Sequence, residues 1–493
     1  MKKFFALLLV FVMALSVLAA CGKTDEGSQA ASDVSQAETS KTDPNAQWKD
    51  SAGNWVPKQP VKDMSGKTFT IIVKGGTGTY QSDDFTTDGT LYGDILNTAV
   101  NDRNNKVEEI YKIELNVVKS ATINEDIQQD LDASAGDYDA IMPNMTALSR
   151  FASEENLYDL TKIKDFDVNA PWYDKNATEA FSIGNAVYFT TGDLTILSKV
   201  NAPSILFNKE MQNDYHLPNL YDLVREKKWT FDKMIDLGKQ VASVTNEDPF
   251  QNTYGMLTSY GDAMVMFGAS GEKVVDKDEN DMPMLKFGST ERSLGIAQKV
   301  LKTLEEGDNW LVFAQDPAFS ADVWVLSLKI FSEGHALFRP SYFSATTKLR
   351  KQSDITFGIL PHPLMDDTQT EYVSYSGTGE TAGIAIPISA KDPEFSAYMI
   401  DAYSAWAKNY VTHAYYDVIL YQRDARDNES EEMLDIIFSN IVYDMGECFN
   451  FGKIKETFYN LARDRSSDIT SAYQSIQGVL ESDVQELRET FEK

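Results

Sequence analysis

The 493-residue chain has little cysteine, little histidine and a deficit of positive charge. Its two cysteines, Cys21 and Cys448, allow one disulfide at most, so no disulfide framework holds the protein together. The four histidines form no His-x-x-x-His or His-Glu-x-x-His pair, which leaves a zinc hydrolase unsupported. The net charge of −30 argues against a basic groove for nucleic acid. It also disfavours anionic ligands, unless a local arginine overrides the long-range field.

Other motifs with their own chemistry are missing or incomplete. The glycine-rich segment 75–81 lacks the Gly-Lys-Ser/Thr ending of a phosphate-binding loop, and no Gly-x-Ser-x-Gly sequence marks a nucleophile. Asp276 and Asp278 begin a calcium-type spacing, but Asp281 stands where that loop needs glycine. We therefore predict a hairpin turn within 274–287, and we expect neither a metal nor a cofactor.

The first part of the chain, residues 1–20, has the layout of a secretory signal peptide. Two lysines precede an apolar run that ends at Leu18, and small residues then lead to Cys21. The tetrad Leu-Ala-Ala-Cys resembles a bacterial lipobox, which implies that Cys21 becomes the mature N-terminus and carries lipid. An ordinary signal peptide with an incidental cysteine is the alternative. Residues 21–50 contain few bulky apolar groups and are predicted to form a flexible linker.

The beginning of the folded region alternates apolar strand patterns with helical patterns. Such an order of strands and helices is typical of a parallel sheet with right-handed crossovers. Ligands of these sheets bind beyond the carboxyl ends of the strands. We expect strands at 67–73, 113–118 and 138–142, separated by helices at 92–112 and 121–135.

Later segments continue the α/β pattern. Thr230 precedes an amphipathic run and is a candidate helix N-cap. Apolar, β-branched segments at 202–209, 355–361 and 382–387 are predicted to be strands, and the chain from Glu394 onward is predicted to be mostly helical. More than 430 residues remain after the signal and linker, which indicates two or more domains.

Several segments occur in an order that resembles the family 1 extracellular solute-binding proteins of ABC transporters, relatives of maltose-binding protein: APSILFNK, EKKWTFDKM, FSEGHALF, TFGILPHP and GDYDAIMPN. Each segment alone is a weak signal. Their order is specific for the family but not for a ligand. The resemblance runs from about residue 67 to 450, and the last forty residues carry little of it.

This resemblance implies a periplasmic-binding-protein-like fold, with two discontinuous α/β lobes joined by a hinge of crossing strands. Lobe one would comprise 67–198 and 362–405, and lobe two 199–361 and 406–493, with one crossing near Tyr403. A ligand held in the cleft would contact both lobes and so favour the closed form. A membrane permease would recognise that closed form. The resemblance implies no covalent chemistry, and we expect a monomer.

Nine side chains at predicted strand or loop ends are candidates for ligand contact. Aromatic rings pack on the flat CH faces of sugars, while Asp, Asn and Arg exchange hydrogen bonds with hydroxyl groups. Each candidate also has a purely structural alternative, such as helix capping for Asn144 or hinge packing for Trp172. The candidates are Tyr80, Asn144, Trp172, Tyr173, Asp193, Trp324, Arg339, Tyr342 and Tyr375.

The resulting hypothesis is a lipid-anchored receptor on the outer face of the cytoplasmic membrane that delivers a carbohydrate to a separate ABC permease. A peptide or another small solute is the alternative ligand. An anchored glycoside hydrolase is a rival function, because 75 acidic residues always allow a catalytic carboxylate pair. A surface adhesin without a small ligand is the third class.

Overall fold

The computed structural model describes residues 43–76, 84–86, 94–319, 323–416 and 428–492. The chain divides into two units, 1–46 and 47–493. Only residues 43–46 of the first unit are described, so the account below concerns the second unit. Within the described part of the chain, no helix is both long enough and apolar enough to cross a bilayer.

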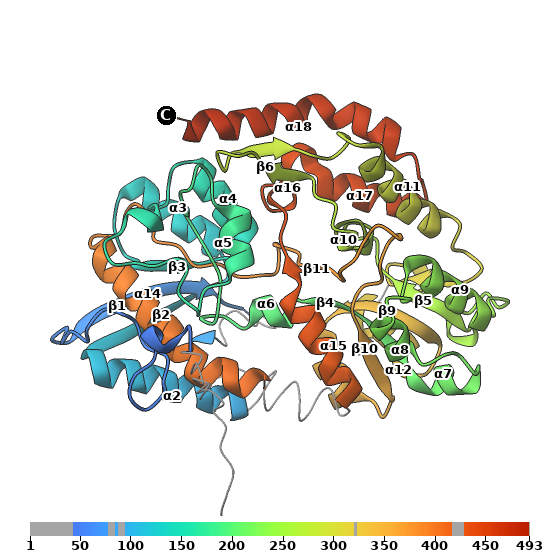
Figure 1. Cartoon of the computed structure of the whole chain (residues 1–493), viewed down its shortest axis with the longest axis horizontal. Helices are drawn as coiled ribbons and strands as arrows, with labels where there is room; N and C mark the ends of the chain where they lie inside the picture. Colours follow the sequence, from blue (N-terminus) through green and yellow to red (C-terminus); the bar gives the residue numbers. More distant parts are fainter. Residues whose placement is uncertain (1–42, 77–83, 87–93, 320–322, 417–427, 493) are drawn as a thin grey trace, which may run out of the picture. The chain divides into compact units, whose positions relative to one another are not determined.

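Three parallel strands form the first sheet, in the order β2–β1–β3 (Figure 1). Ile71, Ile72 and Val73 of β1 are buried, as expected for a strand covered on both faces. Helix α14 (Pro393–Ala407) packs against α2, although some 280 residues separate them in sequence. This sheet confirms the predicted strand–helix order, with these bounds: β1 (Lys67–Lys74), α2 (Asp94–Tyr111), β2 (Ile113–Ser120), α3 (Ile123–Ala133) and β3 (Ala140–Met142).

Five strands form the second sheet, in the order β10–β4–β9–β5–β8. Strand β4 runs antiparallel to both of its neighbours, whereas β5 is parallel to β8 and β9. The carboxyl ends of β5, β8 and β9 therefore meet the amino end of β4 at one edge. The strands are β4 (Pro203–Asn208), β5 (Tyr254–Thr258), β8 (Leu311–Phe313), β9 (Ala336–Tyr342) and β10 (Phe357–Leu360).

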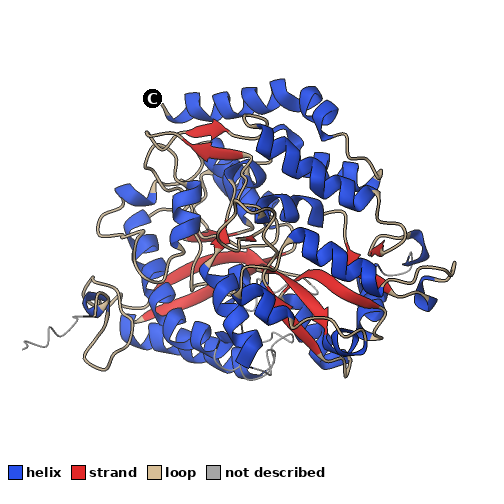
Figure 2. Ribbon diagram, turned by 45° about the vertical axis from the view of Figure 1, so that its right-hand side comes forward, coloured by secondary structure: helices blue, strands red, loops and turns tan. Residues whose placement is uncertain are grey.

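Helices cover the second sheet, and Figure 2 shows the strands inside with helices around them. The predicted N-cap at Thr230 is confirmed, because its hydroxyl accepts the Lys233 N–H at 3.1 Å. These helices are α7 (Lys209–Asp214), α8 (Leu220–Arg225), α9 (Phe231–Val241), α10 (Asp262–Ala269), α11 (Glu291–Glu305), α12 (Val323–Ser332) and α13 (Ser344–Gln352).

A hairpin and the C-terminal helices lie beside α10 and α11. The hairpin confirms the turn predicted within 274–287, and Asp278 accepts the N–H groups of Asn280 and Met282 in its turn. Helix α18 packs on β7 and α11, and α17 packs on α10. The elements are β6 (Val275–Lys277), β7 (Pro283–Leu285), α15 (Asn428–Ser439), α16 (Met445–Cys448), α17 (Ile454–Arg463) and α18 (Ile469–Phe491).

The strand predicted at 382–387 is wrong. Ile384 exchanges backbone hydrogen bonds with Thr190, and Ala385 exchanges them with Ile141, but these remain isolated bridges. The apolar side chains here reflect burial between two neighbours rather than a ladder. A parallel pair that the sequence did not reveal joins β11 (Ser374–Tyr375) to β12 (Ile441–Val442).

Buried apolar side chains form two clusters. One includes Ile71 and Ile141 of the first sheet and extends to Leu206 of the second sheet. The other includes Phe207 and Phe338 of the second sheet. The remaining short elements are η1 (Ala46–Trp48), α4 (Met145–Ser153), η3 (Leu160–Lys162), α5 (Lys175–Phe181), α6 (Leu197–Val200), η4 (Pro249–Gln251), η5 (Pro317–Phe319), η6 (Lys408–Thr412) and η8 (Phe451–Lys453).

Candidate functional site

A cavity of about 400 Å³, called the first cavity below, lies at the edge of the second sheet where parallel strands end. Thr258 ends β5, and the last residues of β9, from Arg339 to Tyr342, form part of the wall. Asn201 precedes β4 and Glu380 follows β11, so segments from outside the sheet complete the lining. This is the place where open α/β sheets bind ligands.

Among the charged side chains in the wall of the first cavity are the partly buried Asp262 and the buried Arg339. Asp262 begins α10 and accepts hydrogen bonds from the Ser259 N–H at 2.7 Å and the Thr258 hydroxyl at 2.8 Å. Burial raises the pKa of Asp262. Arg339 is 7% exposed, and burial lowers the pKa of its guanidinium to about 10. Its Nε has no hydrogen-bond partner among the described residues.

A second cavity, of about 250 Å³, shares Tyr342 with the first. Tyr375 and Tyr459 supply further rings, while Glu447 and Lys455 supply charges. Burial raises the pKa of the Tyr342 phenol, which stays protonated and able to donate. Rings beside carboxylate and ammonium groups suit a ligand that offers both CH faces and hydroxyl groups.

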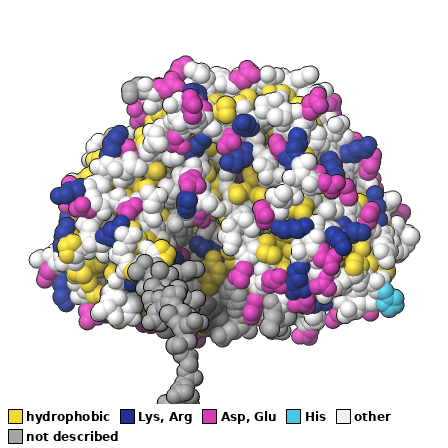
Figure 3. Space-filling view, viewed as in Figure 1, with side chains coloured by type: hydrophobic (Ala, Val, Ile, Leu, Met, Phe, Trp, Pro, Cys, Tyr) yellow, Lys and Arg dark blue, Asp and Glu magenta, His cyan; other side chains and the backbone are white. Residues whose placement is uncertain are grey.

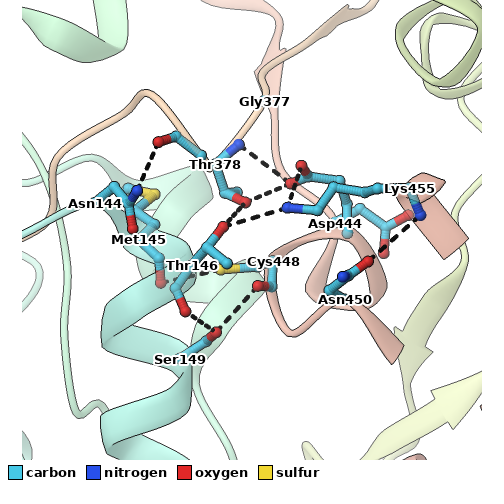
Figure 4. Close-up of polar contacts among 12 residues, drawn as sticks. Asn144, Met145, Thr146, Ser149, Gly377, Thr378, Asp444, Cys448, Asn450 and Lys455 are labelled. Atoms are coloured by element: carbon cyan, nitrogen blue, oxygen red, sulfur yellow. Dashed lines mark hydrogen bonds and ion pairs between the residues drawn. The ribbon is translucent and has the colours of Figure 1, made fainter. Parts of the chain in front are cut away.

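A polar network fixes the segment between the two cavities (Figure 4). The Thr378 N–H donates to Glu447 Oε2 at 3.1 Å, and the Lys455 ammonium lies 3.3 Å from Glu447 Oε1. The Thr378 hydroxyl also meets the Thr146 hydroxyl at 3.0 Å. Residues of α4, of the segment after β11 and of α16 and α17 are thereby joined at one place.

Asn144 caps α4 and ties the same segment to it. Its side chain accepts the Ala147 N–H at 2.8 Å and donates to the Gly379 carbonyl at 2.7 Å (Figure 4). Cys448, beneath this network, is a buried free cysteine. Asn144 therefore supports the cavity wall by both capping and cross-linking.

The structure places Asp193 away from the described cavities. Its carboxylate accepts from the Lys408 ammonium at 2.8 Å and the Thr412 hydroxyl at 2.9 Å, and Lys199 lies 3.9 Å away. The carboxylate is buried in these contacts. It therefore pairs protein groups near the point where the chain passes from the first sheet toward β4.

Trp172 and Tyr173 are buried together against one carboxyl group. Trp172 Nε1 donates to Asp401 Oδ1 at 2.7 Å, and the Tyr173 hydroxyl donates to the same oxygen at 3.1 Å. Burial raises the pKa of Asp401 to about 7. Trp172 also packs edge-on against Trp48, with ring centroids 5.0 Å apart. Both rings line none of the described cavities and hold α14 to the 170–173 turn.

Three of the remaining candidates line the two cavities. Arg339 and Tyr342 lie together in the first cavity, and Tyr342 and Tyr375 lie together in the second. Trp324 belongs to α12, but its side chain is not described, and Tyr80 and Cys21 lie outside the described residues.

Asp262, Glu447 and Lys455 are among the wall residues that sequence reasoning missed. Asp262 lies just beyond the end of β5, a strand that was not predicted, so the strand-end criterion that selected Arg339 could not select it. Nothing in the local pattern singles out Glu447 or Lys455, which reach the site from the C-terminal helices.

Charge on the outer surface is mixed. On the face in Figure 3, acidic and basic side chains are interspersed and form no patch of a single sign. Exposed ion pairs such as Arg225 with Glu432, 2.7 Å apart, contribute little to stability. The acidic excess on this face is therefore a solvated surface rather than a docking patch.

Solved structures of binding proteins share this architecture. A cyclo/maltodextrin-binding protein complexed with maltotetraose is 14% identical, with a TM-score of 0.54 over 86% of this chain and 97% of that one. UgpB of Mycobacterium tuberculosis, in complex with glycerophosphocholine, is 12% identical, with a TM-score of 0.55 over 85% and 99%. The GacH receptor of Streptomyces glaucescens, solved unliganded and with acarbose, is 13% identical, with a TM-score of 0.51 over 86% and 99%.

No protein-family profile and no curated protein sequence matches the chain. The similar structures cover nearly the whole of their own chains, so the likeness extends over a complete architecture. The chain has the periplasmic-binding-protein-like α/β fold of ABC-transporter solute-binding proteins, which confirms the predicted fold class. Identities this low show a shared fold, and the function has to be argued from the site.

Proposed function

We propose that this chain is the solute-binding component of an ABC importer and that its solute is a carbohydrate. The observation that carries the proposal is the first cavity, with Arg339, Asp262 and Tyr342 at the carboxyl edge of the second sheet. Hydroxyl groups of a sugar can pair with the carboxylate and the guanidinium, while the phenol ring packs on a CH face. Maltotetraose and acarbose, bound by two of the similar structures, are ligands of this class.

We propose that binding takes place between two discontinuous lobes, 67–198 with 362–405 and 199–361 with 406–493. The separate sheets support this division. We place the crossing predicted near Tyr403 after Thr412 instead, which moves the end of lobe one from residue 405 to residue 412. Tyr403 stacks on Phe69 of the first sheet at 5.6 Å, and residues 408–412 pack against α2.

We also propose a lipid anchor at Cys21 and an ABC permease as the partner of this receptor. Lipid on Cys21 would hold the receptor at the outer face of the cytoplasmic membrane, where an ABC permease takes the solute from a monomeric receptor. Mass spectrometry of the membrane-bound protein tests this directly, and an unmodified Cys21, or a cleavage site elsewhere, would refute the anchor.

A thermal-shift screen over mono- and oligosaccharides, followed by calorimetry of the positive ligands, tests the proposed function. We expect stoichiometric binding without released products. The Tyr342→Ala variant should lose about tenfold to a hundredfold in affinity, because one ring and one hydroxyl leave the shared wall of both cavities. Tyr215→Ala, at an exposed tyrosine, is the matched control.

The outcomes separate the rival functions. Sustained release of sugar products would establish a glycoside hydrolase and refute the binding protein. Stabilisation by peptides alone would refute the proposal that the solute is a carbohydrate. The absence of any small-molecule response would favour an adhesin.

A further inference from the structure

Two arginines of the described chain are buried, and the protein pairs them differently. Arg103 donates from Nη2 to the Asp84 carbonyl and from Nε to the Asn104 side chain, although its Nη1 stays unpaired. The side chain of Arg339 makes no hydrogen bond and no ion pair with any described residue. Arginine stays protonated at neutral pH even when burial lowers its pKa to about 10, as it does here for both. Arg339 therefore presents an unpaired charge in the wall of the first cavity.

The nearest acidic group does not neutralise Arg339. Asp262 attracts the guanidinium over a distance, but the two form no ion pair, and Asp262 Oδ2 is occupied by Ser259 and Thr258. A buried charge without a partner is strongly unfavourable. An anionic group on the bound ligand would supply the missing partner.

The geometry of the donor and the other charges in the wall indicate which anion fits. A guanidinium offers parallel N–H donors that match the two oxygens of a carboxylate. Lys348 adds a second positive charge to the cavity, whereas Asp262 and Glu380 add two negative ones. The two positive and two negative side chains offset one another, so the wall offers no excess of positive charge for a doubly charged phosphate, whereas one singly charged carboxylate is enough to pair with Arg339.

We propose that the saccharide bound by this protein carries a carboxylate, as a uronic acid does, and that Arg339 holds that carboxylate. The proposal rests on the proposed function and specifies its ligand class. The net charge of −30 opposes an anion at long range, but salt screens that field beyond about 10 Å, and the pairing with Arg339 acts at contact.

Calorimetry with matched ligand pairs tests the proposal: glucuronate against glucose, galacturonate against galactose, and oligogalacturonates against neutral galactose oligosaccharides. We expect the acidic member of a pair to bind at least about tenfold more tightly. In Arg339→Gln this preference should fall to about twofold or less, while Arg339→Lys should retain part of it. Arg225→Gln, which removes an exposed arginine, should keep the full preference.

Folding of the variant can be checked independently. Because the buried Nε of Arg339 has no hydrogen-bond partner among the described residues, Arg339→Gln should unfold at the same temperature as the parent or a higher one. A folded variant that keeps the preference for acidic sugars would overturn the assignment.

The remaining outcomes separate this inference from the proposed function. Tight binding of a neutral saccharide, with equal or weaker binding of its acidic counterpart, would overturn the inference and leave the proposed function standing. Tighter binding of glucose 6-phosphate than of glucuronate would overturn the proposal that the anionic group of the ligand is a carboxylate. Binding of no saccharide would overturn both.

Discussion

Asp401 is a residue whose protonation should control the stability of the protein. Burial raises its pKa to about 7, so the folded protein holds a proton there between pH 4 and pH 7 that the unfolded chain releases. Over this range the folded state binds more protons than the unfolded state. The free energy of unfolding therefore falls as the pH rises from about 4 to about 7, by at most about 1.4 kcal/mol per pH unit, and levels off above 7.

The Asp401→Asn variant should remove this dependence. Its amide oxygen can still accept the hydrogen bonds of Trp172 and Tyr173, but it carries no charge at any pH. We expect the variant to gain stability relative to the parent as the pH rises from 4.5 to 8, measured by urea unfolding followed through tryptophan fluorescence. Asp214→Asn, at an exposed aspartate, is the control. Parallel stability curves for parent and Asp401→Asn would contradict the prediction.

At the scale of elements, helix α10 meets strand β11 through a glycine. A Cβ atom on Gly268 would lie 2.0 Å from the ring of Tyr375, whose hydroxyl donates to Asp444 at 3.2 Å. The close approach positions Tyr375 in the wall of the second cavity. Glycine is therefore required here by packing, although alanine is the better helix former.

We expect Gly268→Ala to destabilise the protein by about 1–3 kcal/mol, because overpacking outweighs the gain of up to about 1 kcal/mol in helix propensity. Gly295→Ala in α11 is the matched control, since a Cβ atom there meets nothing within 4 Å. This control should be neutral or more stable. Chemical denaturation measures both, and equal effects of the two substitutions would refute the packing argument.

At the scale of the whole second unit, the hairpin contacts the segment that follows α5, far away in sequence. Asp281 accepts the Ser182 hydroxyl at 3.0 Å and the Asn185 N–H at 2.8 Å, and its Oδ1 lies 2.8 Å from the Lys277 ammonium. The end of α18 reaches the same region, where Phe491 lies 5.0 Å from Tyr188, ring centroid to ring centroid. Figure 1 shows α18 extending from above α11 toward the first-sheet region.

Asp281→Ala should loosen this connection. Two hydrogen bonds and one ion pair are lost, which corresponds to about 1–3 kcal/mol of local stability. We expect faster amide exchange in residues 182–188, measured by mass spectrometry, with β1 and β4 unchanged. Glu279→Ala, in the same turn, is the control. Unchanged exchange at 182–188 would show that the hairpin does not hold this segment.

The sequence by itself determined the local elements. Continuous apolar runs located β1 and β4, and apolar alternation located β2. A threonine before an amphipathic run located the start of α9, and acidic turn residues located the hairpin. Each of these depends on side chains within a few residues of one another. The same local signal failed at 382–387, because burial and strand pairing both select apolar residues.

Only the tertiary structure decided which polar groups meet. Trp172 and Asp401 are 229 positions apart, and Thr378 and Glu447 are 69 apart, so no periodic pattern could pair them. Arg339 and Tyr342 were predictable as strand-end residues. That the buried Nε of Arg339 has no hydrogen-bond partner among the described residues can be seen only in the packed structure. The physical reason is that local propensity depends on adjacent residues, whereas burial and hydrogen-bond satisfaction depend on long-range packing.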